Sequence, residues 1–425
     1  MIGNRNLSPF SAIVVVEAFG ETYPELVKKQ ASIIDAVMEE ERSFSTMLDR
    51  GIRYFEDEIK RSQKDQGGTV VSADKAFFLY DTLGFPIDLT ELMAQESGMT
   101  VDMAGFFAEM ESQKRRSREA RFAARGMGRK QLELVAEQTS WLAESCIDIT
   151  DDSSKYDRDV EVEAVVKAIF TFDGFIKNSE KADEGSVVGL ILDRSSFYAE
   201  AGGQDADTGT IAFDVGGELL VNDVQIYGGY ILHTGILIGG SISPNSVVKC
   251  RVDYHRRRQV EPNHSMTHVL NAALREVLGE GCDQRGSQCN EEKLRFDFSH
   301  KSAMSTAQLR ATETFVNNAI ARALPVTSEM MSLVDAKAIP NVRAMFGEVY
   351  PDPVRVVRVG NDLSVEFCSG THITNTAEAD AFVLSVETSV AKGIRRITAL
   401  TGDAAKKAMA EGERFIFGSF LALLS

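Results

Sequence analysis

Six short runs of apolar or alternating residues, all between about Ser153 and Tyr254, constrain the fold of this chain more than any other feature. The runs read VEVEAVVKAIF, SVVGLILD, GTIAFDV, ELLVNDVQIY, GYILHTGIL and SVVKCRVDY, and Gly, Asp, Asn or Ser separate them. Short strands at this spacing are typical of a small β-barrel. We therefore expect a barrel in the middle of the chain.

The residues on either side of these runs have a different pattern. From about Thr22 to Arg61 apolar residues recur mostly at three- or four-residue steps, which predicts a long helix, and helical character continues to about Leu142. After Arg256 the chain mixes strands with helices, one of them expected over about Pro262–Leu278. The predicted fold is therefore α+β and multidomain, in the order helical region (1–150), barrel (151–255), mixed α/β zinc-binding region (256–410) and start of a further region (411–425).

Composition limits the function classes. The five cysteines are too sparse for a disulfide framework and are typical of reduced thiols inside a cell, so we expect a cytoplasmic protein. No apolar run reaches the ~18 residues that a membrane span needs. A net charge of −17 argues against non-specific nucleic-acid binding. Basic runs at 113–130, 255–259 and 392–396 interrupt the acidic background, although a single run is more often a solvated face.

Two four-residue spacings suggest a metal site. His264 and His268 lie one turn apart on the predicted helix and can face one ion, although their apolar neighbours would place this helix in a core without any metal. Cys368 and His372 repeat the spacing on a turn that follows a strand. One thiolate and three imidazoles suit Zn²⁺ better than Mg²⁺ or Ca²⁺. The alternative is a buried free cysteine near an unrelated histidine.

These residues resemble the editing domain of alanyl-tRNA synthetases, whose HxxxH and CxxxH zinc motifs are similar to HSMTH and CSGTH here. The family's other motifs recur in the same order, as FYAEAGGQDADTG, QRGS, LRFDFSH, FGEVYPDPVRVV and AKGIRRITALTG. Upstream, LYDTLGFPIDLT is similar to the family's helical tRNA-recognition region. The resemblance covers nearly the whole chain, from Leu7 to about Ala410, and is closest to a eukaryotic cytosolic member.

The resemblance implies zinc-dependent hydrolysis of seryl- or glycyl-tRNA(Ala). Gln284 looks like the family's pocket glutamine, and Ser265 keeps a hydroxyl where the family commonly has threonine. The alternatives are a tRNA-binding module with structural zinc, or a fragment of a full ATP-dependent ligase. A full-length member also has a catalytic domain that binds ATP and alanine. Nothing before the long helix resembles that domain, so we do not expect ligase activity from this chain alone.

The implied partner is the acceptor end of the tRNA. Asp81 is the first candidate for acceptor-stem recognition and Asp88 the second, although a cap or turn role is an alternative for both. Arg295 and Asp297 belong either to the surroundings of the zinc or to the support of a strand. The residues expected to contact tRNA phosphates are Arg256, Arg257, Arg258, Lys392, Arg395 and Arg396.

Overall fold

The computed structural model describes residues 8–64, 69–124, 132–177, 185–214, 216–344, 350–391 and 393–424. It divides the chain into two compact units, residues 1–129 and 130–425. The α+β class that the sequence predicts is confirmed, since helices and antiparallel sheets both occur. Within these described ranges, no helix is long and apolar enough to cross a membrane.

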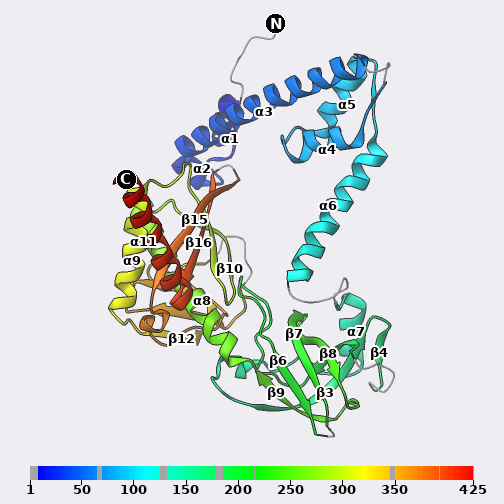
Figure 1. The fold of residues 1–425 in the computed structure, drawn as a ribbon, viewed down its shortest axis with the longest axis vertical. Helices are drawn as coiled ribbons and strands as arrows, with labels where there is room; N and C mark the ends of the chain where they lie inside the picture. Colours follow the sequence, from blue (N-terminus) through cyan, green and yellow to red (C-terminus); the bar gives the residue numbers. More distant parts are fainter. Residues whose placement is uncertain are drawn as a thin grey trace. The chain divides into compact units, whose positions relative to one another are not determined.

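The first unit is mainly helical (Figure 1). Its core packs Phe55, Leu79, Phe85 and Phe106 together. Gly51 lets its own segment approach Phe85, because a Cβ at Gly51 would overlap the Phe85 ring. The elements are α1 (Ser8–Phe19), α2 (Pro24–Lys28), α3 (Gln30–Lys64), β1 (Val70–Val71), α4 (Ala73–Asp81), α5 (Ile87–Glu96), β2 (Thr100–Val101) and α6 (Met103–Ala124).

The second unit begins with α7 (Ala136–Glu144) and the 3₁₀ turn η1 (Ser153–Tyr156), and then forms the predicted barrel. All six predicted runs are strands, which pair in the order β3, β5, β8, β7, β6, β9, and β9 closes the barrel by pairing with β3. Side chains alternate between the two faces of each strand, so the apolar ones point inward and form one shared core. The strands are β3 (Val162–Thr171), β4 (Gly174–Ile176), β5 (Val187–Leu192), β6 (Gly209–Phe213), β7 (Glu218–Tyr227), β8 (Tyr230–Ile238) and β9 (Val247–Val252).

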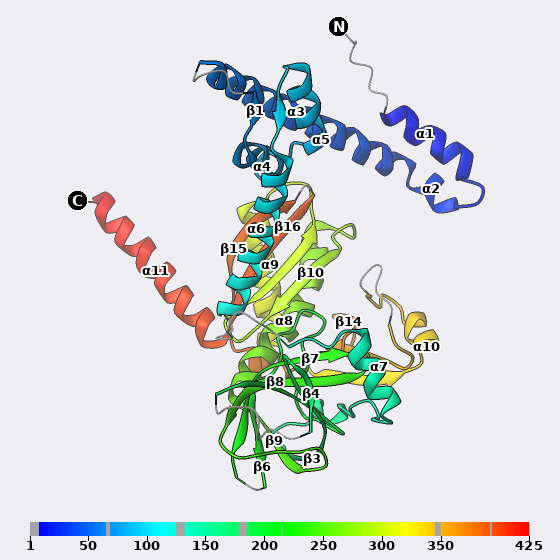
Figure 2. The ribbon, with the colours of Figure 1, turned by 90° about the vertical axis from the view of Figure 1, so that its right-hand side faces the viewer.

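Helix α8 (Tyr254–Leu278) follows the barrel directly and lies between it and the mixed α/β region (Figures 1 and 2). The prediction that this helix starts near Pro262 is wrong by eight residues. Asp253 caps the true start, where its carboxylate accepts a hydrogen bond from the Arg256 N–H at 3.0 Å. Pro262 lies inside α8, where it removes one backbone hydrogen bond without ending the helix.

Two antiparallel sheets complete the second unit. One has the order β10-β11-β16-β15, and the other has the order β12-β13-β14. Helices α8 and α9 share a core with the first sheet, which includes Leu270, Phe296 and Ile397. The elements are β10 (Gln284–Cys289), β11 (Leu294–Ser299), α9 (Thr306–Ala321), β12 (Val326–Met331), α10 (Leu333–Ala338), β13 (Val354–Val359), β14 (Ser364–Phe367), η3 (Thr376–Ala379), β15 (Phe382–Ala391), β16 (Ile394–Thr401) and α11 (Gly402–Leu424).

Candidate metal centre

The structure brings the four predicted metal ligands together. His264 and His268 lie on α8, whereas Cys368 and His372 lie on the segment that follows β14. One nitrogen or sulfur atom from each residue lies within 4.8 Å of those of the other three. The Cys368 Sγ and His264 Nε2 atoms are 3.3 Å apart. The two helix histidines are buried and the two loop residues are half-buried, so the exposed part of the group is on the loop side.

The orientation of the His264 ring is fixed by Gln204. The Gln204 Oε1 atom accepts a hydrogen bond from the Thr371 N–H at 2.9 Å, while its Nε2 donates to Thr371 Oγ1 at 2.9 Å. These contacts settle which end of the amide is the oxygen. The same oxygen lies 2.6 Å from His264 Nδ1, so this nitrogen must donate. His264 Nε2 therefore keeps its lone pair for a ligand.

The other two rings are held in a similar way. His268 Nδ1 lies 2.6 Å from the buried carboxylate of Glu366, which can only accept when it is ionised. His372 Nδ1 lies within hydrogen-bond distance of Ser265 Oγ, at 3.1 Å, and that oxygen accepts from the Ile373 N–H at 3.2 Å. Ser265 is fully buried. Outer contacts of this type fix the tautomer and direction of histidines that bind metals.

The Nε2 atoms of the three histidines are consequently left to bind an ion. His268 Nε2 and His372 Nε2 are buried and have no hydrogen-bond partner among the described residues. Such orphaned polar atoms are costly unless something else binds them. Together with His264 Nε2 and the Cys368 sulfur they form a set of three imidazoles and one thiol. This set fits a tetrahedral Zn²⁺ ion and suits Mg²⁺ and Ca²⁺ poorly.

The electrostatics also favour a cation. Burial raises the pKa of the Cys368 thiol, but the three imidazoles outweigh burial and hold this pKa well below its usual value. Burial lowers the pKa of His268, but Glu366 and Cys368 outweigh it and raise this pKa to about 10. Burial lowers the pKa of His372 to about 3, against the attraction of Cys368. The thiolate and the Glu366 carboxylate thus attract a cation, and a bound ion would have to displace the extra proton that the raised pKa of His268 implies.

Gly370 lets the cysteine-containing turn approach α8. A Cβ at Gly370 would overlap the His264 ring and would lie 2.9 Å from Gln204 Oε1. A larger residue would therefore push the turn away from the helix. Close approach of the two half-motifs depends on this one missing side chain.

Glu366→Gln is expected to weaken zinc binding about 10- to 100-fold, which is the usual cost of losing an outer partner of a metal-binding histidine. The amide has the same shape but no charge to hold the His268 Nδ1 proton. Glu387→Gln is the matched control, because Glu387 is equally buried (9% against 8% exposed) and pairs with Arg395 instead. Competition with a chromophoric chelator gives both affinities. Equal affinities in the two variants would remove Glu366 from the site.

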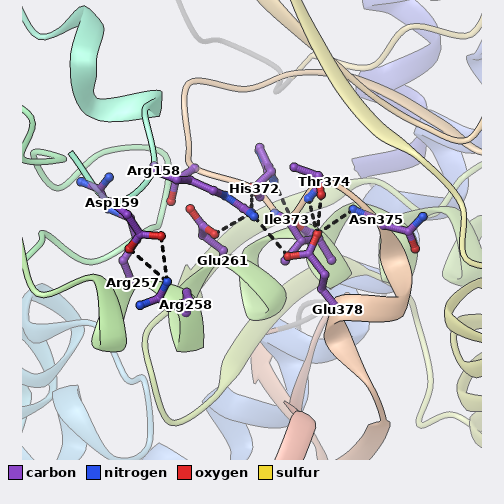
Figure 3. Close-up of polar contacts among 12 residues, drawn as sticks. Arg158, Asp159, Arg257, Arg258, Glu261, His372, Ile373, Thr374, Asn375 and Glu378 are labelled. Atoms are coloured by element: carbon purple, nitrogen blue, oxygen red, sulfur yellow. Dashed lines mark hydrogen bonds and ion pairs between the residues drawn. The ribbon is translucent and has the colours of Figure 1, made fainter.

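The basic run at 255–259 divides into three environments. Arg256 donates to the Ala206 carbonyl at 2.7 Å and pairs with Glu291 at 2.8 Å. Arg258 is exposed and pairs with Asp159 at 3.0 Å (Figure 3).

Arg257 is only 2% exposed, and its three guanidinium nitrogens all donate to protein oxygens. A phosphate contact is therefore not open to this side chain in the structure. We correct the expectation and assign Arg257 a structural role.

Two arginines of the basic run at 392–396 are also paired with acids. The Arg395 guanidinium makes two hydrogen bonds to Glu387, at 2.5 and 2.8 Å. The Arg396 guanidinium makes two to Asp297, at 2.6 and 2.7 Å. Asp297 thus supports the contact between β11 and β16. Lys392 lies outside the described residues.

The remaining predicted residues have local surroundings of their own. Asp81 ends α4 and accepts from Gln113 Nε2 at 2.7 Å. Gln284 begins β10 and donates to Ser287 Oγ at 3.2 Å. Asp88 lies in the first turn of α5, where an acid is favourable. Arg295 Nε is buried and has no hydrogen-bond partner within the described part of the chain.

Two residues that hold the ligands were missed by sequence reasoning about individual sites. Gln204 lies in the AGGQDADTG stretch, which was noted only as a family motif. Glu366 lies two residues before Cys368 in the short, fully buried strand β14. The signal available in the sequence was an acid two positions before Cys368, because residues two apart on a strand point to the same face and a buried acid needs a partner.

Comparisons with known proteins show the family to which the chain belongs. Residues 7–256 match the family described as "tRNA synthetases class II (A)", and residues 354–398 match the "Threonyl and Alanyl tRNA synthetase second additional domain". The chain is 42% identical over 414 residues to an alanine–tRNA ligase of Schizosaccharomyces pombe, a match that covers 93% of the chain and 43% of the relative. A cytoplasmic alanine–tRNA ligase of Dictyostelium discoideum is 39% identical (93% and 43%), and an alanine–tRNA ligase of Hydrogenovibrio crunogenus is 40% identical (94% and 43%). The chain spans less than half of the length of these relatives.

Proposed function

We propose that this chain, which belongs to the alanyl-tRNA synthetase family, hydrolyses mischarged seryl- or glycyl-tRNA(Ala) at a zinc ion. The observation that carries the proposal is the convergence of His264, His268, Cys368 and His372, with the outer nitrogen of each ring already held. ATP and alanine are proposed as partners of the full-length family member only. We propose a cytoplasmic location, which the name of the Dictyostelium relative states for that protein.

A hydrolytic site answers a physical problem of selecting alanine. A pocket for alanine cannot exclude glycine by size, and rejection of serine by a single hydroxyl gives limited discrimination. A second site that hydrolyses the wrong ester corrects these errors after they are made. Such a site needs a group that recognises the aminoacyl part and a means to promote attack on the ester.

Bound zinc would supply a positive charge that polarises the ester or holds the aminoacyl group. Four protein ligands would fill a tetrahedron, so contact with the ester requires that one ligand yields or that the shell expands; otherwise the ion would hold the pocket while another group positions water. Ser265 would then act indirectly, because its buried hydroxyl orients the His372 ring. We propose that Gln284 orients the aminoacyl group, since its amide contacts Ser287, and Ser287 packs against Gly203 beside the His264 partner Gln204.

The tRNA would contact the chain through exposed or half-exposed basic side chains. Arg256, Arg258, Arg395 and Arg396 keep this proposed role, although each must share its guanidinium with an acid. Salt dependence of tRNA binding would reflect these phosphate contacts. We propose that Asp81, exposed at the end of α4, contributes to acceptor-stem recognition.

The chain is expected to release serine from seryl-tRNA(Ala) faster than it releases alanine from alanyl-tRNA(Ala). A polar pocket can hold the serine hydroxyl, whereas an alanine methyl leaves polar groups there unpaired. Release of the labelled amino acid is measured for both charged tRNAs, with and without a zinc chelator. Glycine lacks the hydroxyl, so glycyl-tRNA is measured separately.

The same assay separates the main alternative, a tRNA-binding module with structural zinc. That alternative predicts tRNA binding with serine release no faster than in buffer. It would replace our proposal if the chain retained zinc and bound the tRNA without hydrolysing it.

A further inference from the structure

Three backbone carbonyls of the turn that carries Cys368 are held by side chains from other segments. The Arg355 guanidinium donates to the Cys368 carbonyl at 3.0 Å and to the Gly370 carbonyl at 2.8 Å. The Tyr156 hydroxyl donates to the Ser369 carbonyl at 3.0 Å. The Arg355 guanidinium also lies over the Tyr156 ring, 4.1 Å from its centroid. The two side chains therefore support each other as well as the turn.

Arg158 holds the other end of the same segment. One of its terminal nitrogens donates to the His372 carbonyl at 2.9 Å and to the Glu261 carboxylate at 2.9 Å. The other donates to Glu378 at 3.2 Å. Figure 3 shows Arg158 reaching between these acceptors. Glu261 is 5% exposed on α8, so a buried acid fixes the position of the arginine.

These contacts matter because the segment has no regular secondary structure, and Gln204 and Ser265 bind only its side chains and N–H groups. Residues 368–373 belong to no helix or strand, and they include Gly370, whose backbone is the most permissive. The direction of each carbonyl sets the backbone angles beside Cys368 and His372. Donors aimed at the carbonyls therefore reduce the number of conformations that the two ligands can adopt.

We propose that Tyr156, Arg158 and Arg355 form a carbonyl clamp, whose function is to position Cys368 and His372 for the metal. Two of the three residues come from the segment just before the barrel, so the barrel side of the unit helps to determine metal affinity. The proposal rests on the metal site of the proposed function. It requires no particular substrate, because the clamp contacts only the backbone of the ligand-bearing segment.

Tyr156→Phe tests the clamp with the smallest change, and Tyr254→Phe is a matched control. Both tyrosines are partly exposed and donate to a carbonyl at 3.0 Å, and both lie under an arginine, but Tyr254 bonds Val160 instead of the metal-binding turn. We expect Tyr156→Phe to weaken zinc binding about 10-fold. It should also change the visible absorption bands of the Co²⁺-substituted protein, which report ligand geometry. Tyr254→Phe should do neither.

Arg158 provides a second, independent test. Arg158→Ala should weaken zinc binding more than Arg158→Lys, which keeps a charge beside Glu261 and one donor for the His372 carbonyl. Arg251→Ala, which removes an exposed ion pair with Glu161 in the barrel, should bind zinc like the wild type. Tyr156→Phe keeps every charge and so remains informative if Arg158→Ala does not fold.

The outcomes separate the two proposals. Wild-type zinc affinity and Co²⁺ spectra in both Tyr156→Phe and Arg158→Ala would overturn the clamp and leave the proposed hydrolysis intact. Reduced affinity in these variants supports the clamp even if the wild-type chain hydrolyses no charged tRNA. A wild-type chain that binds no metal would overturn both.

Discussion

Cys368→Ala is expected to lose both its zinc and its hydrolysis of seryl-tRNA(Ala). The substitution removes the only sulfur from the ligand set and the negative charge that the surrounding imidazoles stabilise. The loss of zinc affinity should exceed the ~10- to 100-fold typical of outer partners, because a direct ligand is removed. Elemental analysis gives the zinc content, and serine release gives the rate. Binding of the tRNA should persist, since phosphate contacts do not involve the thiol.

Cys282→Ala is the control for this substitution. Burial raises the pKa of the Cys282 thiol to about 12, so it stays protonated and acts as a small apolar side chain. It should keep full zinc content and hydrolysis. Full zinc content in Cys368→Ala would exclude the sulfur as a ligand. Zinc loss with unchanged serine release would instead show that the metal is structural.

Among the proposed substitutions, Arg257→Ala is expected to destabilise the chain most, with the free energy of unfolding falling by about 3–5 kcal/mol. The change leaves the buried Asp207 carboxylate without its arginine, although the Tyr198 N–H still donates to it at 2.7 Å. It also removes the donors to the Lys155 and Ser196 carbonyls. Denaturant unfolding followed by circular dichroism measures the difference.

Arg258→Ala is the adjacent control. Its ion pair with Asp159 is exposed, and pairs of this kind contribute about 0–1 kcal/mol. The two neighbouring substitutions should therefore differ several-fold in cost. A similar cost for both would show that the buried pair is not important for stability.

The sequence could predict which four residues converge because their spacing carries the geometry. Positions four apart on α8 must share a face, and a cysteine–histidine pair on a turn offers donors of the matching type. The barrel was predictable for the same reason, since its strands keep their period and their separators. Both signals are local, and they needed no knowledge of distant residues.

The roles of the basic residues were harder to predict, because charge alone does not indicate which way a side chain points. Arg256, Arg257 and Arg258 look like one patch in sequence, but successive positions on a helix point about 100° apart. One side chain therefore enters the core and its neighbour reaches the solvent. Arg395 and Arg396 point to opposite faces of a strand, and their acidic partners come from different neighbouring strands. Such pairings depend on tertiary structure.

Because the two half-motifs lie far apart in the chain, a shared ion would act as a cross-link. Positions 268 and 368 are 100 residues apart (368 − 268 = 100), and all of β10 to β14 lies between them. In the chain-entropy description, a link across about 100 residues lowers the freedom of the unfolded chain by roughly 4–5 kcal/mol. An ion held at this point would join α8 to the segment that follows β14, as a disulfide would, but through bonds that a chelator can break.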